Sequence, residues 1–515
     1  MSEQNKSNKP TRSGNTIRRG GPAKPFRGAK PGGIQRPRNP KQIGVKGMHA
    51  HDADALMPGA PLVITIKRIG INGEGVGYYR RKAVFITNAL PGEIVHASVT
   101  NVHSTYIEAK LTKVEKKSSD RIDPKCPVYD ECGGCQLQHA KYESHGSYKA
   151  ELIQEAFTRY AGVEDLPIRS MASASEPWGY RNKAQFQVQL SFNAEGKPTV
   201  ELGLYKADSH DLVDAVKAGC AVQHPMTLRV MEKVKTFVNS VKAPIHHPRH
   251  NPSGLRTVVT RVSMATKEVQ LTFVTGSANF PPLSKIVERV QRELPEVTTI
   301  AHNIQPNDTS LVFGEETRII WGKPEMTERF LDLDVHVSPR AFLQLNPVQT
   351  EKLYRYVMEA ANLQGTEQVA DMHCGTGAIA LSLAPLCGQV RGVDTTEEAI
   401  EDAKKNAEKR QAKNSRFFIG KAESWLPRWL HSGWIPNVVV LDPPRSGCEE
   451  DLLRGLIRRE FVAGTRIVYV SCNPATLAKD ANWLLKAGYQ LKWIQPVDMF
   501  PQTAHVEAVA LFIRK

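Results

Sequence analysis

A cysteine near the end of the chain lies where a strand is expected to pass into a helix, in the segment Val468-Tyr-Val-Ser-Cys-Asn-Pro-Ala-Thr-Leu477. The apolar residues before Cys472 predict a buried strand, and Pro474 is typical of the first turn of a helix. Cys472 would then lie at a helix N-terminus, where the dipole favours the thiolate. Such a cysteine can act as a nucleophile. A small buried cysteine in a structural turn is the alternative.

A carboxylate that could act as the matching base is Glu507, at the start of an otherwise apolar segment, Val506–Phe512. Partial burial there would raise its pKa towards neutrality, which is the range a general base needs. Cys472 and Glu507 together predict covalent catalysis with a proton transfer. A glutamate at the exposed end of a strand is the alternative.

A glycine-rich run, Asp371-Met-His-Cys-Gly-Thr-Gly377, falls at a predicted turn from a strand into a helix. Glycine lets a backbone approach a ligand closely, and the helix N-terminus offers free N–H groups. Asp394 ends the next strand, where an acid holds ribose hydroxyls in nucleotide-binding folds. Ala380 replaces the third glycine of the dinucleotide fingerprint, so a tight structural turn is the alternative. The candidates for cofactor contact in the loop are His373, Gly375, Gly377 and Ala378.

The elements that position these residues alternate between strand and helix from about residue 331. Asn346 and Pro347 predict a helix start, and Thr395 and Glu398 predict a capping box for another helix. This alternation predicts a doubly wound parallel sheet, in which the carboxyl ends of the strands share one edge. The predicted strands are Gln368–Asp371, Val390–Asp394, Asn437–Leu441, Arg466–Val470 and Glu507–Ile513.

The order of these marks resembles the class I S-adenosylmethionine methyltransferases. The marks are the glycine-rich loop, the acid Asp394 and the run Asp442-Pro-Pro-Arg445 at the end of another strand. The last run is also similar to a motif of amino-group methyltransferases, which need no nucleophile. A base-amine methyltransferase is therefore one alternative function, and in it Cys472 would be structural.

Two motifs resemble one family more closely. The run Tyr469-Val-Ser-Cys-Asn-Pro-Ala-Thr-Leu477 and the run Asp498-Met-Phe-Pro-Gln-Thr-Ala-His-Val-Glu507 are similar to those of the TrmA/RumA-type RNA uracil-C5 methyltransferases. The resemblance implies that Cys472 adds to C6 of a uracil, which makes C5 able to attack the methyl group of S-adenosylmethionine. It also implies that Glu507 removes the C5 proton. Gln502 replaces the first histidine of the second motif, so no role is carried over to it.

The resemblance also implies further cofactor contacts. Gln344, in Ala341-Phe-Leu-Gln-Leu-Asn346, matches a glutamine that contacts S-adenosylmethionine in the family. Asp394 and Asp442 match acids that contact the cofactor, although the first is usually glutamate. His373 stands where the family commonly has an aromatic residue.

A group of cysteines, Cys126, Cys132 and Cys135, has the spacing C-x5-C-x2-C. Three close thiolates indicate a metal site, and the spacing alone leaves zinc and iron–sulfur open. The segment is similar to the [4Fe–4S] site of the RumA branch, and this resemblance implies Cys220 as the fourth ligand. We expect the cluster to order the middle domain.

The N-terminal part of the chain is basic. Residues 1–50 contain 12 Lys and Arg against one acid, Glu3, while the whole chain has a net charge of +15. This composition predicts a disordered tail that adds salt-sensitive affinity for nucleic acid; a solubilising tail is the alternative. Residues 60–117 contain short strands punctuated by glycine, typical of a small OB-type barrel, and resemble the RNA-binding TRAM domain.

The expected chain is therefore multidomain. An N-terminal OB-like β-barrel (TRAM) precedes an α+β middle domain with an iron–sulfur cluster and a C-terminal α/β, Rossmann-like class I methyltransferase. The boundaries are 1–55 for the tail, 56–119 for the barrel, 120–330 for the middle domain and 331–515 for the methyltransferase. A length of 515 residues suits several domains.

The combination of TRAM domain and cluster implies the 23S rRNA branch of the family rather than the tRNA branch. We therefore expect 23S rRNA as the partner, S-adenosylmethionine and a [4Fe–4S] cluster as cofactors, and no obligatory protein partner. The sequence has no apolar run long enough to span a membrane and no secretory signal, so a cytoplasmic location is expected. A non-catalytic RNA-binding iron–sulfur sensor is a further alternative.

Overall fold

A computed structural model describes residues 56–515. The basic tail, residues 1–55, lies outside the described residues, and so does the prediction made for it. Among residues 56–515 no helix is long and apolar enough to cross a bilayer.

The first element is a six-stranded sheet in the order β1-β5-β6-β4-β3-β2. Alternate residues of β1 are buried, as expected for a sheet closing over its own core. The sequence did not predict β3, because glycines were interpreted as turn residues. Gly77 is a residue of β3, and glycine is required there because a Cβ would lie 2.2 Å from the side chain of Ile64. The strands are β1 (Pro61–Thr65), β2 (Arg68–Ile69), β3 (Gly75–Tyr79), β4 (Lys82–Thr87), β5 (Ile94–Val102) and β6 (Tyr106–Lys116).

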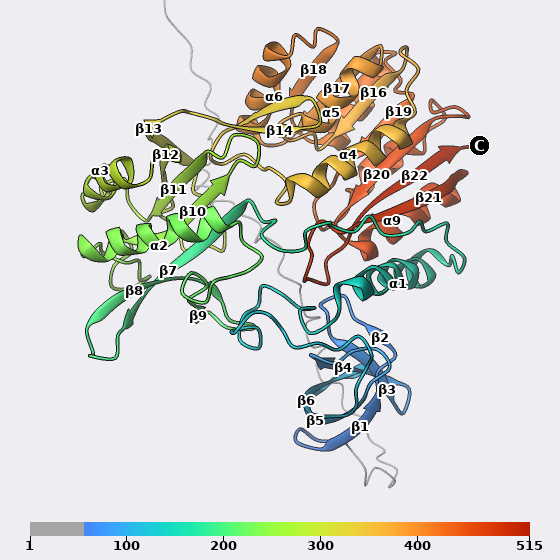
Figure 1. Cartoon of the computed structure of the whole chain (residues 1–515). Helices are drawn as coiled ribbons and strands as arrows, with labels where there is room; N and C mark the ends of the chain where they lie inside the picture. Colours follow the sequence, from blue (N-terminus) through green and yellow to red (C-terminus); the bar gives the residue numbers. More distant parts are fainter. Residues whose placement is uncertain (1–55) are drawn as a thin grey trace, which may run out of the picture. The chain divides into compact units, whose positions relative to one another are not determined.

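The cysteine-bearing segment leads into a long helix, α1 (Tyr142–Ala161), which ends at Gly162 in the left-handed conformation. One face of α1 is buried. Ile153 and Phe157 are fully buried on it and pack with residues of the C-terminal sheet and its helices. The helix therefore shares a core with the methyltransferase part of the chain (Figure 1).

A mixed seven-stranded sheet follows, in the order β13-β12-β11-β10-β7-β8-β9. Its helices, α2 (Pro225–Ser240) and α3 (Pro282–Glu293), bury their apolar faces in the same cluster as Ala184, Phe186 and Val188 of β7. The strands are β7 (Lys183–Phe192), β8 (Pro198–Tyr205), β9 (Leu212–Val213), β10 (Leu255–Val262), β11 (Val269–Thr275), β12 (Val297–Ile304) and β13 (Glu316–Gly322). The hairpin β14 (Met326–Phe330) and β15 (Leu333–Val337) comes next.

The C-terminal sheet has seven strands in the order β18-β17-β16-β19-β20-β22-β21. Alternate residues of its central strands face two clusters: Val438 and Val440 pack with α4, α5 and α6, whereas Val439 and Leu441 pack with α1, α7, α8 and α9. Helices thus cover both faces, as expected for a doubly wound sheet. The strands are β16 (Gln368–Met372), β17 (Gln389–Asp394), β18 (Ser415–Ile419), β19 (Val438–Leu441), β20 (Arg466–Ser471), β21 (Tyr489–Val497) and β22 (Glu507–Arg514). The helices are α4 (Pro347–Ala361), α5 (Ala378–Leu383), the 3₁₀ turn η1 (Ala384–Leu386), α6 (Glu397–Lys409), α7 (Ala422–His431), α8 (Glu450–Leu456) and α9 (Pro474–Lys486).

Two local predictions for this domain were wrong. The sheet is not wholly parallel, because β22 runs antiparallel to both β20 and β21. The segment between β21 and β22 reverses the chain without a crossover helix, and a parallel partner would need one. The capping box is also absent: the N-cap of α6 is Thr396 and makes no side-chain cap bond. The Asp394 carboxylate instead accepts the Thr396 N–H at 2.8 Å.

Candidate active site

The glycine-rich loop joins β16 to α5 and contains three residues in the left-handed backbone region. The φ values are 69° for His373, 52° for Gly375 and 81° for Gly377. A Cβ at Gly377 would lie 3.0 Å from the Phe417 ring, whereas a Cβ at Gly375 would meet nothing within 4 Å. Gly377 is therefore required for packing, while Gly375 borders open space that a ligand can approach. Ala378 begins α5 and is buried.

Asp394 ties the end of β17 to this loop. One of its carboxylate oxygens accepts the Gly375 N–H at 3.1 Å, and the other accepts from Thr396. The acid predicted to hold a ribose thus also fixes the shape of the glycine-rich loop.

Asp371, at the start of the loop motif, is a buried acid to which the sequence assigned no role. One oxygen accepts the Ala380 N–H at 3.0 Å, and the other has no hydrogen-bond partner within residues 56–515. Burial, and next the neighbouring Asp442, raise its pKa well above the usual range. The sequence feature that could have identified Asp371 as a site residue is its position at the carboxyl end of a strand beside a glycine-rich turn.

Asp442, which follows β19, completes an acidic group with Asp371 and Asp394. Burial raises the pKa of Asp442 to about 7, and the Asp394 charge adds to the shift. Several carboxylates near each other are unfavourable without a counter-charge. S-adenosylmethionine carries a sulfonium and an ammonium group, so this acidic group and the unpaired oxygen of Asp371 fit the cofactor.

Cys472 lies between β20 and the N-cap of α9, Asn473, as predicted. The predicted thiolate, however, is not favoured in the protein alone. The pKa of the Cys472 thiol is raised to about 12, mainly by burial and then by the Glu507 and Asp442 carboxylates, while Arg445 opposes the rise. Desolvation and nearby negative charge outweigh the helix dipole here.

Glu507 is buried at the start of β22, and the prediction of a raised pKa is confirmed. Burial raises the pKa of Glu507 to about 8; Asp442 adds to the shift and Arg445 opposes it. The structure therefore brings Cys472, Glu507 and Asp442 into one neighbourhood with Arg445.

Two residues of this neighbourhood carried no predicted role of their own. Arg445 Nη2 lies 3.5 Å from Nε2 of His505. Burial, followed by the charges of Arg445, Lys149 and Arg181, lowers the pKa of His505 to about 4. The ring is therefore neutral at physiological pH and accepts from the guanidinium. Arg445 and His505 lie inside the two motifs Asp442–Arg445 and Asp498–Glu507, and this position is the only sequence feature that could have indicated a role for them.

Asn473 holds the two motifs together. Its side-chain oxygen accepts the Ala475 N–H at 3.1 Å, which caps α9, and its amide nitrogen donates to the Arg445 carbonyl at 2.9 Å. The turn that carries Cys472 is thereby fixed to the Asp442–Arg445 segment.

Gln344 is buried in the segment before α4. Its main-chain carbonyl accepts the Asn182 side-chain amide at 3.1 Å. Asn346, two residues later, caps α4 by accepting the Gln349 N–H at 3.3 Å, as predicted. The segment therefore links the middle sheet to the start of α4.

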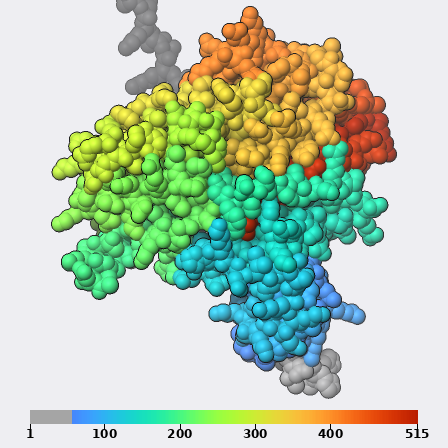
Figure 2. Space-filling model, viewed as in Figure 1, coloured from blue at the N-terminus to red at the C-terminus, as the bar shows by residue number. Residues whose placement is uncertain are grey.

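The loop between β21 and β22, residues 498–506, leads directly into Glu507. The Gln502 carbonyl accepts N–H bonds from Gln136 and Leu137, both at 3.0 Å, so the cysteine-bearing segment contacts this loop. Tyr180 donates to the Pro501 carbonyl at 3.0 Å. In Figure 2 the C-terminal part of the chain, in red, is visible at the right-hand edge and again in a small central area bordered by blue-green segments.

The four candidate metal cysteines lie near one another. The pKa of Cys135 is raised to about 12, mainly by burial; a hydrogen bond with Gln138 opposes the rise, and the charges of Cys220, Cys132 and Cys126 add to it. Nevertheless, no group of three or more His, Cys, Asp or Glu side chains in the described part of the chain is arranged to hold a metal ion. The donor set suits an iron–sulfur cluster chemically, but the side chains do not form a coordination shell.

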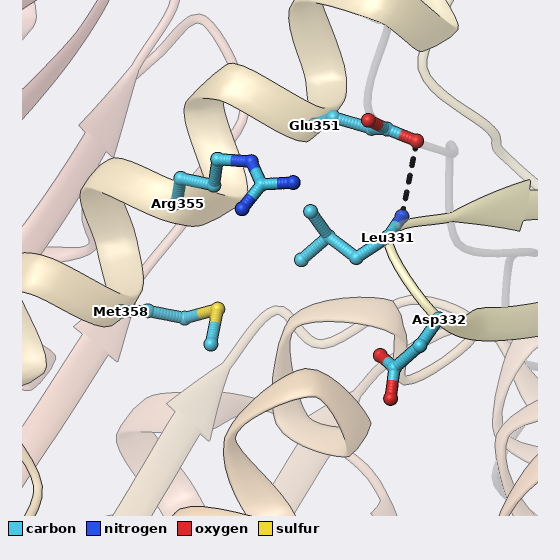
Figure 3. A pocket seen from close by; sticks show the side chains of 5 residues that line it. All are labelled: Leu331, Asp332, Glu351, Arg355 and Met358. Carbon is cyan, nitrogen blue, oxygen red and sulfur yellow. Dashed lines mark hydrogen bonds between the residues drawn. The ribbon is translucent and has the colours of Figure 1, made fainter.

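A hollow of about 630 Å³ lies elsewhere, between the turn from β14 to β15 and the outer face of α4. Figure 3 shows Arg355 and Met358 of α4 beside Leu331, whose N–H donates to Glu351 at 3.1 Å. None of the predicted site residues lines this hollow.

The strand-end loops, the acidic group and the N-terminal barrel define an S-adenosylmethionine-dependent methyltransferase fused to an RNA-binding module. Family models agree: residues 55–112 match the TRAM domain, and residues 363–479 match a methyltransferase domain.

Whole-chain comparisons narrow the class. An uncharacterised RNA methyltransferase of Halalkalibacterium halodurans is 45% identical over 89% of this chain and 97% of its own. One from Bacillus cereus is 43% identical over 89% of this chain and 97% of its own. The crystal structure of the Pyrococcus abyssi tRNA (uracil-54, C5)-methyltransferase with S-adenosyl-L-homocysteine has a TM-score of 0.67 and 25% identity, covering 88% of this chain and 100% of that one. The chain belongs to the TrmA/RumA-type RNA methyltransferases.

Proposed function

We propose that this protein methylates C5 of a uridine in 23S rRNA, in the cytoplasm, through a covalent bond between Cys472 and uracil C6. The observation that supports this most is the common neighbourhood of Cys472, Glu507, Asp442 and Arg445, at the edge of the sheet where β19 and β20 end and the antiparallel β22 begins. An amine methyltransferase needs neither the thiol nor the buried base.

The roles of the residues follow from the chemistry of uracil. Cys472 releases its thiol proton to solvent and its sulfur bonds to C6, while the C5–C6 π electrons move into an enolate, so that C5 becomes nucleophilic. S-adenosylmethionine supplies the methyl group that C5 attacks. Glu507 then removes the proton from C5, the electrons restore the C5–C6 double bond, and the Cys472 sulfur leaves. Arg445 opposes the rise in pKa of both Cys472 and Glu507, so it stabilises negative charge as the thiolate forms.

Cofactor binding is assigned to Gln344, His373, Gly375, Gly377, Ala378, Asp394 and Asp442. We add Asp371, because its unpaired buried oxygen needs a donor. The acidic group suits the positive charges of the cofactor.

Covalent trapping tests the mechanism. The protein is mixed with S-adenosylmethionine and 5-fluorouridine-substituted rRNA and analysed on a denaturing gel. Fluorine cannot leave as a proton, so RNA should remain bonded to Cys472 and the shifted band should vanish in Cys472→Ala. Methyl transfer to ordinary RNA without any trapped band would favour the base-amine alternative, which rests on Asp442-Pro-Pro-Arg445.

The substrate needs its own test, because the solved relative from Pyrococcus abyssi is named as a tRNA enzyme. We expect 5-methyluridine in 23S rRNA, and not in tRNA, when both unmodified RNAs are offered together and digested for mass spectrometry. Methylation of tRNA alone would reject the ribosomal assignment. No methyl transfer to either RNA would favour the RNA-binding sensor.

We further propose that Cys126, Cys132, Cys135 and Cys220 hold a [4Fe–4S] cluster that orders the middle domain. The mutual influence of the four thiols supports this. Anaerobically purified protein should contain iron and acid-labile sulfide and show visible absorption. Zinc without sulfide would reject the iron–sulfur assignment.

A further inference from the structure

A pair of arginines lies beside the free edge of the C-terminal sheet, where β18 is the last strand (Figure 1). Arg391 of β17 and Arg416 of β18 are register partners in parallel strands, so their side chains project from the same face of the sheet. Phe418, two residues after Arg416, packs against Trp425 and Trp429 of α7. The two arginines therefore lie on the face that α7 covers.

A row of three indoles holds two arginines on this face. The ring centres of Trp425 and Trp429 are 6.0 Å apart, and those of Trp429 and Trp434 are 5.2 Å apart. The guanidinium carbon of Arg391 lies 4.2 Å from the centre of the Trp434 ring, and that of Arg428 lies 5.2 Å from the centre of the Trp425 ring. Both distances suit a cation–π interaction, so each end of the row carries a positioned guanidinium group.

The positive charge of these arginines is not neutralised. Within residues 56–515, the side chains of Arg391, Arg416 and Arg428 form no ion pair and no hydrogen bond, and Nε of Arg391 is buried without a partner. Burial, and then the like charge of Arg416, lower the pKa of Arg391. Glu423, the acid of α7, is paired with Lys421. Neighbouring like charges are unfavourable by themselves, and an anion bound between them would relieve the repulsion.

We propose that these arginines, together with the indoles that hold them, bind the phosphate backbone of RNA outside the active site. The arginine–tryptophan surface consists of Arg391, Arg416, Arg428, Trp425, Trp429 and Trp434. A guanidinium group matches the oxygens of a phosphate with two parallel hydrogen bonds. Several separate cations suit a chain of regularly repeated phosphates better than a single anion. The inference rests on the RNA substrate of the proposed function and adds a second contact region to it.

The surface lies away from the catalytic end of the sheet. Arg391 precedes Asp394 by three residues, which is about 10 Å along a β-strand. Arg416 likewise lies near the amino end of β18. An RNA must therefore extend beyond the uridine at Cys472 to reach the arginine–tryptophan surface, and a short RNA should not contact it.

The first experiment compares Arg416→Met with Arg292→Met. Arg416 is exposed, so its replacement should not disturb the fold, and Arg292 is an exposed arginine of α3 beside the middle sheet. The probes are a short and a long fluorescent oligouridylate, each titrated at several salt concentrations. For the long RNA, Arg416→Met should bind more weakly, and the slope of log affinity against log salt should fall by about 0.7, the loss of one phosphate contact. A slope equal to that of Arg292→Met, or an equal loss for the short RNA, would overturn the proposal.

A second experiment tests the stacked guanidinium without removing its charge. Arg391→Lys keeps the positive charge but loses the planar group that lies on Trp434 and can donate two parallel bonds. This variant should bind the long RNA more weakly, whereas its salt slope should remain close to that of the wild type. Wild-type affinity would remove Arg391 from the surface and overturn the assignment of the indole row.

Calorimetry distinguishes other sources of the anion. Inorganic phosphate should bind weakly, because one phosphate meets only part of the surface. Tight phosphate binding that is lost in Arg416→Met, with long-RNA affinity unchanged, would overturn the RNA assignment. Poly-glutamate is titrated in the same way, and the same result with it would assign the surface to an acidic protein instead.

These binding measurements do not require methyl transfer. If the wild-type protein forms no 5-methyluridine but Arg416→Met still lowers the salt slope, the proposed function fails and the RNA surface stands. If 5-methyluridine forms and the slope does not change, the proposed function stands and the surface is rejected.

Discussion

Lys149 and Asp498 form a buried ion pair between α1 and the loop that leads to Glu507, with Nζ 2.5 Å from Oδ1. Lys149 also donates to the Phe500 carbonyl at 3.2 Å, and Tyr142 donates to the second oxygen of Asp498 at 2.7 Å. Burial lowers the pKa of Lys149, although the Asp498 charge opposes the shift. The pair fixes the start of the loop that carries the candidate base.

Breaking this pair should strongly destabilise the protein. Asp498→Asn leaves Lys149 buried without a counter-charge, and such a loss costs about 3–5 kcal/mol. Urea denaturation measures the change. Glu450→Gln, which breaks the exposed Glu450–Arg454 pair of α8, is the matched control and should have little effect. Equal effects of the two variants would mean that the buried pair does not hold the loop.

Gln502 should act through its main chain. Its carbonyl accepts two N–H bonds from the cysteine-bearing segment, and its φ is 69°. Gln502→His should therefore keep the rate of methyl transfer, because histidine tolerates this backbone region. Leu137→Ala should cost about 2–5 kcal/mol of stability and lower kcat, because Leu137 is buried against Ala504 of the same loop. If Gln502→His were as inactive as Leu137→Ala, the side chain itself would be required.

The pH dependence of the reaction should follow the buried base. The pKa of Glu507 is raised to about 8 in the free protein, so below that pH the carboxyl is protonated and cannot accept the C5 proton. kcat/KM for RNA should rise with pH and level off above about 8. The apparent value belongs to Glu507 and Cys472 together, because the Glu507 charge raises the pKa of the Cys472 thiol. A profile that falls between pH 6 and 8 would contradict this assignment.

Glu507→Gln should stop the cycle after the methyl group is transferred. The amide cannot remove the C5 proton, so ordinary RNA should stay bonded to Cys472 and turnover should fall by about 10²–10⁴. A denaturing gel with and without S-adenosylmethionine shows the adduct. Wild-type turnover by this variant would remove Glu507 from the mechanism.

Asp394 should matter for cofactor affinity, because its carboxylate holds the Gly375 N–H as well as lying at the predicted ribose position. Asp394→Asn should weaken S-adenosylhomocysteine binding by about 10–100-fold, the range for losing a hydrogen bond to a charged group. Glu401→Gln, an exposed change on α6, is the control. Affinity is measured by calorimetry, and equal S-adenosylhomocysteine affinities for the two variants would exclude a role of Asp394 in cofactor binding.

Local sequence determined much of the methyltransferase domain. Asn346 followed by Pro347 predicts the start of α4, since capping and proline geometry depend only on neighbouring residues. The same is true of Pro474, which predicts the start of α9 after Cys472. The motifs around Cys472 and Glu507 indicated the family from the sequence for a similar reason: each motif is a continuous run of residues, so it can be recognised without the fold.

Other features were decided only by the tertiary structure. An apolar strand buried on both faces has the same pattern in either direction, so the antiparallel course of β22 was not visible in Glu507–Ile513. The pKa of Cys472 depends on carboxylates from other strands, and their charge reverses the effect expected from the helix dipole alone. The Lys149–Asp498 pair and the register pairing of Arg391 with Arg416 join residues that are distant in the chain. Long-range burial and charge arise only when the chain is folded, and they set the chemistry of this site.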